Sequence, residues 1–438
     1  MTNDRPKPGY EQPGVGVIPE DWEVALISEL TSEVGDGIHA TPLYSNNGDY
    51  YFVNGNNLLN GTIVINQDTK RAEISEFRKY RKNLTERSIL LSINGTIGNL
   101  AFYRNEPIIL GKSAAYLNVR NNISTQFFYY ALQTRNVEDF FEDGLTGTTI
   151  RNLGLGTIRN TPIDIPGDYG EQRSISQVLS DVDALIAGLD KAIDKKRAIK
   201  TATMQQLLTG KKRLLGFDEG KGYQQTAIGV IPEDWNTATL TDISSNSGLV
   251  RGPFGGTLKK EFFVKNGYKV YEQRNAIYRS VEIGNYYIDL NKFNELSRFR
   301  VDPGDLIVSC SGTIGCIYRI PENAPQGVIN QALLKIRLNA EIVDQDFFLT
   351  VFRSEIFQER ITDNSHGGAM QNLVGMETFK NTLLQLPPLK EQRAIATVLS
   401  DMDAAIAALE SRLAKTQSLK QGMMQQLLTG KVRLKIEA

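Results

Sequence analysis

The residues whose chemistry could support catalysis do not form a recognisable catalytic set. Gly111-Lys112-Ser113 has the tail of a phosphate-binding loop, but Glu106 stands where that loop requires its first glycine. The two histidines, His39 and His366, lie far apart in the sequence, which disfavours a shared metal or catalytic centre. The chain also lacks an Asn-Pro-Pro-Tyr motif and a glycine-rich cofactor fingerprint after a strand. We therefore expect no catalytic residues, no metal and no cofactor in this chain.

A long internal repeat explains most of the remaining motifs. Gly16–Trp22 returns as 229–235, and the Gly-Thr-Ile-Gly of 95–98 returns at 312–315. Met204–Lys211 returns as 424–431, so the offset grows from 213 to 217 to 220. Such a repeat predicts two similar structural units in tandem. Features that both copies share are expected to serve the scaffold or a common partner, and features that differ are expected to set two specificities.

Comparison of the two repeats indicates that several potentially reactive residues have structural roles. Cys310 and Cys316 flank the second Gly-Thr-Ile-Gly, where the first copy has Ile93 and Asn99, so we predict small buried or half-buried side chains. A serine and two aspartates do recur, but no histidine or lysine base accompanies them. We expect an exposed helix face, suited to contacting a partner, at Ser180, Asp181, Asp183, Ser400, Asp401 and Asp403.

Composition places the chain among ordinary globular proteins. Its 438 residues are 41% hydrophobic and 23% charged, which suits two to four domains. No apolar run approaches a membrane span, and the first residues lack the apolar stretch of a signal peptide, so a cytoplasmic protein is expected. The formal net charge is −1, so any surface that binds nucleic acid has to be a local basic one.

Each repeat begins with a β-rich α+β domain and ends with a long helix. Buried strands are predicted at 89–91 and 306–308, and helix starts at 126–132 and 346–349. From Glu171 to Leu208, and again in the second copy, apolar residues recur at close to a 3.5-residue period, with Leu185, Ile199 and Leu419 among them. Gly210 and Gly430 are predicted C-terminal caps. The predicted segments are a lead-in (1–13), a first domain (14–165), a central helix (166–213), a linker (214–226), a second domain (227–386), a C-terminal helix (387–430) and a tail (431–438).

The apolar stripe on each helix needs a partner surface. The simplest solution pairs the two helices with each other, and a pseudo-two-fold repeat makes that pair antiparallel, with the domains at opposite ends of a rod. The alternative is that each helix packs on its own domain, although the stripe is long for one small domain. The predicted seam residues are Ile175, Val182, Leu189, Ile193, Ile395, Met402, Leu409 and Leu413.

Both domains carry basic stretches interleaved with aromatic residues, as a DNA-binding surface requires. Lysine and arginine hold phosphates, whereas asparagine, glutamine and arginine read base edges. The predicted phosphate contacts are Lys70, Arg71, Arg78, Lys79, Arg81, Lys82, Arg251, Lys259, Lys260, Lys265 and Arg279. The predicted base readers are His39, Thr41, Asn54, Asn56, Asn57, Gln273, Arg274 and Asn275.

The doubled order of these motifs resembles one family. Two variable domains, each followed by a helix that opens on Glu-Gln-Arg and closes on Gln-Gln-Leu-Leu-Thr-Gly, resemble the specificity subunit of type I restriction-modification enzymes. Further similar motifs are 18–22, 37–42, 251–256, 303–305 and 386–393. The first copy departs from the pattern at Glu86-Arg87-Ser88 and at 165–170, where the loops differ from those of the second copy.

The resemblance implies a non-catalytic, DNA-binding subunit of a larger enzyme. Each domain would be a target recognition domain that reads one half of a bipartite, asymmetric site in double-stranded DNA, and the helices would set the gap between the halves. Two modification subunits, which bind S-adenosylmethionine and methylate adenine, would dock along the helices, and restriction subunits that use ATP and Mg would translocate and cut. Two readings remain open beside it: a two-headed scaffold that binds proteins instead of DNA, and a free-standing enzyme with an unrecognised site.

Overall fold

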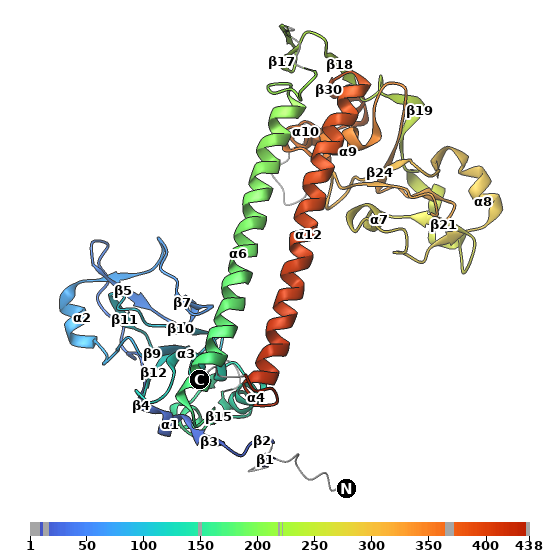
Figure 1. The fold of residues 1–438 in the computed structure, drawn as a ribbon. Helices are drawn as coiled ribbons and strands as arrows, with labels where there is room; N and C mark the ends of the chain where they lie inside the picture. The colour runs from blue at the N-terminus through green and yellow to red at the C-terminus, as the bar shows by residue number, and fades with distance from the viewer. Residues whose placement is uncertain are drawn as a thin grey trace. The chain divides into compact units, whose positions relative to one another are not determined.

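The computed structural model describes residues 9–11, 17–147, 151–217, 220, 222–363 and 372–434. The chain divides into two compact units: unit 1 takes the residues up to Lys191 together with those from Glu410 onward, and unit 2 is Ala192–Leu409. Each unit is a mixed α+β domain joined to parts of two long helices (Figure 1). Within the described residues, no helix is long and apolar enough to cross a membrane. His366 lies outside the described residues.

Unit 1 is built on two small sheets. An antiparallel sheet has the order β10-β9-β12-β4, and a second sheet has the order β11-β5-β8, in which β11 and β5 are parallel. Their strands are β4 (Thr31–Asp36), β5 (Tyr50–Val53), β8 (Arg71–Ala72), β9 (Ser88–Ser92), β10 (Leu100–Phe102), β11 (Ile108–Leu110) and β12 (Ala114–Val119). Short pairs complete the unit: β1 (Tyr10–Glu11) with β2 (Ile18–Pro19), β3 (Trp22–Leu26) with β15 (Pro162–Pro166), β6 (Leu58–Leu59) with β7 (Thr62–Ile63), and β13 (Leu145–Thr146) with β14 (Asn152–Leu153). Its short helices are α1 (Ile27–Leu30), α2 (Ile74–Tyr80), α3 (Thr125–Ala131), α4 (Arg135–Asp143) and α5 (Leu155–Arg159).

Unit 2 repeats this plan. The antiparallel sheet β19-β27-β24-β25 corresponds to β4-β12-β9-β10, and the second sheet, β20-β22-β21-β26-β23, again has one parallel pair, β21 with β26. The strands are β19 (Ser244–Arg251), β20 (Phe263–Val264), β21 (Tyr268–Tyr271), β22 (Tyr287–Ile288), β23 (Arg300–Val301), β24 (Leu306–Ser309), β25 (Ile317–Arg319), β26 (Gly327–Ile329) and β27 (Leu333–Leu338). The pairs are β16 (Tyr223–Thr226) with β17 (Gly229–Pro232), β18 (Asn236–Thr239) with β30 (Leu383–Leu386), and β28 (Thr362–Asp363) with β29 (Asn372–Leu373). The short helices are α7 (Gln273–Ile277), α8 (Leu290–Glu295), α9 (Gln345–Arg353), α10 (Glu355–Ile361) and α11 (Met376–Lys380).

The predicted buried strands and helix starts are confirmed. Every residue of β9 and of β24 is buried. The predicted first helix is α3, and its N-cap is Ser124, whose hydroxyl accepts a hydrogen bond from the Phe127 amide. The matching cap of α9 is Asp344.

The two long helices are α6 (Tyr169–Leu208) and α12 (Leu389–Leu427). Gly210 and Gly430 follow their ends with φ of 68° and 66°, so the predicted glycine caps are confirmed. A side chain would also have no room there, because a Cβ at Gly210 would lie 2.4 Å from Pro232 and one at Gly430 would lie 2.4 Å from Pro19. The shared Ile-Pro motif therefore packs directly on the glycine cap of a long helix in each unit.

Each unit combines the start of one long helix with the end of the other. In unit 1, Asp183 on α6 lies 2.6 Å from Lys420 on α12 and accepts a hydrogen bond of 2.8 Å from Tyr130. In unit 2 the equivalent pair is reversed, with Asp403 on α12 lying 2.5 Å from Lys200 on α6. These contacts and those described next make α6 and α12 antiparallel within each unit. Asp183 and Asp403 thus pair the two helices. The predicted exposed face is confirmed for Asp181, Ser400, Asp401 and Asp403, whereas Ser180 and Asp183 are half-buried.

An ion network around a buried glutamate fastens each domain to both helices. In unit 2, Arg213 bonds both oxygens of Glu391 at 2.8 and 2.6 Å and both oxygens of Asp234 at 2.8 and 2.9 Å. The indole of Trp235 donates to the same Glu391 at 2.9 Å. The side chains of Arg213 and Glu391 are only 3% and 1% exposed, so their charges depend on one another.

Unit 1 contains the same network with the roles of the repeats exchanged. Arg433 bonds Glu171 at 2.5 and 2.8 Å and Asp21 at 2.8 and 2.7 Å, and the Trp22 indole donates to Glu171 at 3.3 Å. The hydrogen bond from Arg433 lowers the pKa of Asp21. Nearby, the Tyr10 hydroxyl donates to the Gly430 carbonyl at 3.0 Å. The segment at Gly9 therefore lies beside the end of the second helix, and the equivalent Tyr223 hydroxyl donates to the Gly210 carbonyl at 3.4 Å.

The glutamine after each network glutamate holds a short helix in place. The Gln172 side chain accepts from the Ser124 amide at 2.8 Å and donates to the Pro166 carbonyl at 3.0 Å. Gln392 makes the same contacts with the Asp344 amide and the Pro387 carbonyl, both at 2.8 Å. The Glu-Gln pair of each Glu-Gln-Arg motif is thus a buried junction between domain and helix.

The predicted seam is only partly a helix–helix seam. Ile175 and Ile395 lie in the main cores of units 1 and 2, which also contain Trp22 and Trp235 respectively. Leu189 and Ile193 are buried, whereas Val182, Met402, Leu409 and Leu413 are half-buried. Three other apolar residues of the predicted stripe are exposed: Leu185 by 43%, Ile199 by 45% and Leu419 by 60%. Both predicted modes of packing therefore occur, because the outer turns of each helix pack on a domain.

Removing one charge from the more buried network should destabilise the protein strongly. We expect Glu391→Gln to lower the free energy of unfolding by about 3 kcal/mol, because Arg213 then stays buried with half of its counter-charge. The neighbouring Arg393→Gln is the matched control, since that side chain is 66% exposed and its partner Asp344 lies at 3.7 Å, a geometry worth less than about 1 kcal/mol. Urea unfolding followed by circular dichroism measures both, and equal effects would contradict the assigned role of Glu391.

Candidate nucleic-acid interface

Four strands of unit 1 end against one short turn, Gly111–Ser113. After β4, the Gly37 and Ile38 amides donate to the carbonyls of Ala114 and Leu110 at 2.9 and 2.7 Å. After β5, the Val53 carbonyl accepts from the Gly111 amide at 2.8 Å, and after β9 the Ile93 amide donates to Ser113 at 2.9 Å. The turn itself joins β11 to β12. The loops that follow these strands therefore form one edge, called the strand-end edge below.

The predicted base readers of unit 1 all lie on this edge. His39, Thr41 and Asn56 are exposed, and His39 is held by Asp36, whose carboxylate lies 2.7 Å from its Nε2. Asn54 and Asn57 are half-buried and serve the loop, because Asn54 accepts from Ser113 at 3.0 Å and Asn57 donates to the Val64 carbonyl at 3.0 Å. The first three residues are therefore better placed than the last two for contact with a ligand.

The predicted basic stretch flanks the same edge. Leu43 and Ser45, in the loop after β4, bond to the side chains of Glu76 and Glu73 at the start of α2, at 2.9 and 2.5 Å. The interaction with Tyr80 raises the pKa of Lys79, so that side chain is a cation at neutral pH. The predicted phosphate contacts of this unit are exposed except Lys82, which is half-buried: Lys70, Arg71, Arg78, Lys79, Arg81 and Lys82.

Unit 2 builds the equivalent edge around the turn Asn330–Ala332. Arg251 at the end of β19 pairs with Leu334, and Ser309 at the end of β24 pairs with Leu333. At the end of β21, the Tyr271 carbonyl accepts from the Asn330 amide at 2.9 Å. The topology is that of unit 1, but the loops after β19 and β21 have different sequences and lengths.

The predicted contacts of unit 2 separate into exposed and structural residues. Lys259, Lys260, Lys265, Arg274 and Arg279 are exposed, as are the aromatic residues Phe254 and Tyr278 that sequence reasoning grouped with them. Arg251 is half-buried, with its guanidinium 5.8 Å from the centre of the Phe254 ring.

Two amide side chains of unit 2 are less accessible than a base reader needs to be. The side-chain amide oxygen of Gln273, Oε1, is buried and has no hydrogen-bond partner within the described structure. Asn275 is fully buried, and its amide bonds the Glu272 amide and the carbonyls of Ser280 and Ile283 at 2.7–2.9 Å. Asn275 therefore shapes the loop after α7, and its buried amide argues against the predicted role in base reading.

The two cysteines behave as the repeat predicts. Cys310 is buried and Cys316 is half-buried, and both are free thiols. Burial raises the pKa of the Cys310 thiol to about 11, so it stays protonated at neutral pH.

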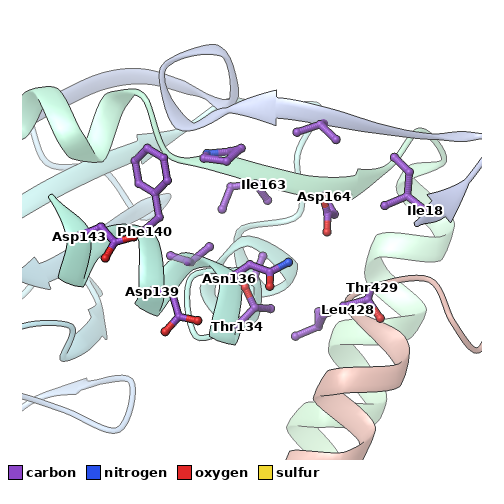
Figure 2. Close-up of a pocket in the computed structure, with 14 residues that line it drawn as sticks. Ile18, Thr134, Asn136, Asp139, Phe140, Asp143, Ile163, Asp164, Leu428 and Thr429 are labelled. Atoms are coloured by element: carbon purple, nitrogen blue, oxygen red, sulfur yellow. Dashed lines mark hydrogen bonds between the residues drawn. The ribbon is translucent and has the colours of Figure 1, made fainter. Parts of the chain in front are cut away.

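A hollow of about 460 Å³ in unit 1 lies away from the strand-end edge. It is lined by Ile18, by Thr134, Asn136, Asp139 and Phe140 near or on α4, by Asp164 on β15, and by Leu428 and Thr429 after α12 (Figure 2). Burial raises the pKa of Asp164.

Unit 2 has a hollow of about 470 Å³ at the equivalent place, where Leu208 and Thr209 replace Leu428 and Thr429. The charges around the two hollows differ, because aspartates surround the first whereas Arg353, Arg360 and Lys211 line the second. Opposite charges do not favour one ligand common to both hollows.

Sequence reasoning missed the residues that join the units to the helices. Glu171 and Arg433 are 262 positions apart, and nothing in either segment shows that they meet. The available signal was recurrence: Asp183 and Lys200 return at the same offset of 220 as Asp403 and Lys420. In an antiparallel pair of repeats, the aspartate of one repeat lies against the lysine of the other, so Asp183 pairs with Lys420 and Asp403 with Lys200.

Comparison with known proteins agrees with the doubled architecture. A family model described as the type I restriction modification DNA specificity domain matches residues 19–196 and again 232–420. The putative MjaX specificity subunit of Methanocaldococcus jannaschii is 26% identical, over 97% of both chains, and the MjaVIII specificity subunit of the same organism is 25% identical over 95% of this chain and 94% of its own. The EcoBI specificity subunit of Escherichia coli is 22% identical over 76% of this chain and 71% of its own.

Solved structures share the fold. A type I restriction-modification S subunit from M. genitalium superposes with a TM-score of 0.52 at 17% identity and covers 93% of this chain and 96% of its own. A second chain comes from a structure described as the basis of complex assembly and conformational transition of the type I R-M system. It superposes with a TM-score of 0.58 at 13% identity and covers 95% of this chain and 99% of its own.

If α2 and the segment that follows it contact a polyanion, Lys79 on α2 and Lys82 after it should contribute through charge alone. We expect Lys79→Ala with Lys82→Ala to weaken binding to every DNA sequence and to reduce the slope of log affinity against log salt by about one unit per lost contact. Arg120→Ala is the control, because this exposed cation of unit 1 follows β12, at the opposite end of that strand from the Gly111–Ser113 turn. An unchanged affinity and salt slope in the lysine variant would show that Lys79 and Lys82 do not contact DNA.

Proposed function

The chain belongs to the type I restriction modification DNA specificity family, and we propose that its two domains each read one half of a divided DNA sequence. The observation that carries this proposal is the strand-end edge, which both units build on one topology from loops of different sequence. Variable loops on a constant scaffold are suited to two distinct recognition tasks.

Within each edge we assign separate tasks to cations and to polar loop residues. The cations of β8 and α2 in unit 1, and Lys259, Lys260 and Lys265 in unit 2, hold phosphates and contribute affinity without sequence choice. His39, Thr41 and Asn56 in unit 1, and Arg274 in unit 2, are exposed polar residues that could reach base edges. This assignment keeps part of the predicted set of base readers and excludes Asn275.

The helices α6 and α12 would set the gap between the two halves of the site. Each unit is fastened to both helices by an ion network around a buried glutamate, so a domain cannot turn freely on its helix. A fixed attachment of this kind is what a constant spacing between half-sites requires.

The chemistry of the complex would belong to partner subunits. Two modification subunits would bind S-adenosylmethionine, methylate adenine and dock along the helices, where Leu185, Ile199 and Leu419 are exposed apolar residues suited to a protein contact. Restriction subunits would supply ATP-dependent translocation and cleavage. This chain would act in the cytoplasm as a non-catalytic subunit.

Exchanging one domain should change one half of the methylated sequence. Leu26 pairs with Pro162 at the base of unit 1, so residues 27–161 can be replaced by a relative's segment with both junctions side by side. The reciprocal exchange of 240–382 uses the matching pair Thr239 and Leu383. Sequencing of methylated adenines should show a different half changed in each exchange. Changes in both halves from one exchange would contradict independent reading, and wild-type complexes without any DNA affinity would favour the protein-binding scaffold.

Lengthening both helices should change the gap and not the bases. We expect a heptad inserted after Leu189, with a matched heptad after the equivalent Leu409, to add about 10 Å of helix, close to three base pairs. The same sequencing would then report unchanged half-sites with a longer spacer. An unchanged spacer in a folded variant would show that the helices do not set it.

A further inference from the structure

One segment of the strand-end edge is the same in both units although the loops around it differ. The turn Gly95–Gly98 follows β9, the turn Gly312–Gly315 follows β24, and both have the sequence Gly-Thr-Ile-Gly. The loops after β4 and β19 share no such sequence, nor do those after β5 and β21. A constant turn among variable loops suggests a contact with something that both half-sites contain.

Both turns have the same internal geometry. The carbonyl and hydroxyl of Ser92 accept from the amides of Gly98 and Asn99 at 3.0 and 2.8 Å. Ser309 makes the same two bonds with Gly315 and Cys316 at 2.9 and 3.0 Å. The glycines have φ between 67° and 93°, a region that other residues rarely adopt, so glycine is required for the shape of the turn.

Each turn presents three consecutive backbone N–H groups that the fold does not use. Within the described part of the chain, the amides of 95–97 and of 312–314 have no hydrogen-bond acceptor, and the tips of both turns are exposed. Successive unpaired N–H groups in a turn form a concave site that favours an anion. A Cβ at Gly95 or Gly312 would meet no atom within 4 Å, so space is open above both turns.

Positive charge lies near each turn. In unit 1, Lys112 is exposed, and its carbonyl accepts from the Asn94 side chain at 3.5 Å, next to Gly95. In unit 2, Arg251 and Val308 both pair with Leu334, so Arg251 lies in the same sheet as the strand that leads into the second turn. On the side of α4, Ile97 and Gly98 line a hollow that also contains Arg135, Glu138, Asp139 and Glu142, so a phosphate at the first turn would lie on its Lys112 side.

We infer that each Gly-Thr-Ile-Gly turn binds a phosphodiester group of DNA through its backbone amides, one turn for each half-site. The inference rests on the proposed DNA-binding function and names a contact that the basic side chains do not provide. The phosphate backbone is common to both half-sites whatever their bases, which explains why this turn is constant while its neighbours vary.

The decisive variant removes one amide N–H from the turn, at a residue that is not among those with a positive φ. Thr96→Pro deletes the Thr96 N–H, and Thr96→Ala is the matched control because it deletes only the hydroxyl. The full chain, assembled with its modification subunits, is titrated against a duplex that carries its own methylated sequence. We expect Thr96→Pro to weaken binding about tenfold, equivalent to about 1.4 kcal/mol, and Thr96→Ala to bind like the wild type. The salt slope should stay unchanged, because an amide releases no counterion, in contrast to the loss of a lysine.

A scan with single methylphosphonate linkages identifies the phosphate on the unaltered protein. One neutralised linkage in the half-site read by unit 1 should weaken the wild type and have no further effect on Thr96→Pro. Thr313→Pro should show the same coupling in the other half-site, which provides an independent test if the first variant does not fold. Loss of modification-subunit assembly without this coupling would assign the turn to a protein contact and overturn the inference, as would a changed methylated sequence. A wild-type complex that does not bind DNA would refute the proposed function itself.

Discussion

The structure depends on a glutamate that is buried at the start of each long helix. Glu171 and Glu391 are 2% and 1% exposed, and each accepts hydrogen bonds from an arginine and a tryptophan indole. Burying a carboxylate is costly unless it is paired, so the arginine, the aspartate and the indole have to be present together. Because these groups come from a domain, from one helix start and from the end of the other helix, one interaction fixes three elements in each unit.

This junction lets the rest of the domain vary. The fastened parts are β3 and β15 in unit 1 and β18 and β30 in unit 2, which lie at the base of each domain, while the strand-end loops contribute nothing to the ion networks. Substitutions in the loops therefore leave the attachment to the helices intact. We conclude that binding specificity and assembly are carried by separate parts of each unit, as expected of a scaffold that supports many recognition sequences.

The sequence predicted the scaffold better than the site. Periodicity and recurrence were sufficient for the strands β9 and β24, the start of α3, the glycine caps at Gly210 and Gly430, and the two long helices, because each of these depends on local chemistry. They were not sufficient for Glu171, since an acidic residue near a helix start is ordinarily a solvated group that favours the helix dipole. Its burial is decided by Arg433, which no local pattern connects to it.

Burial of the loop residues could not be predicted from the sequence either. Asn275 and Arg274 are neighbours of similar polarity, yet Asn275 is fully buried and hydrogen-bonded within its loop whereas Arg274 is exposed. Composition could identify the basic and amide-rich stretches, but the direction of each side chain depends on the turn it occupies. The internal repeat does not help with these directions, because the loops differ in sequence between the two copies.

The crosswise assembly of the repeats also constrains folding. The network of unit 1 closes between residues 262 positions apart, and that of unit 2 between residues 178 positions apart. Contacts of such long range are slow to form because the entropy of loop closure is lost before they contribute stability. Unit 1 in particular stays incomplete until the end of the second helix has been synthesised, since Glu171 has no cation to neutralise it before Arg433 arrives. The two domains therefore differ in sequence and in the bases they are proposed to read, yet neither reaches its final attachment without a helix end from the other repeat.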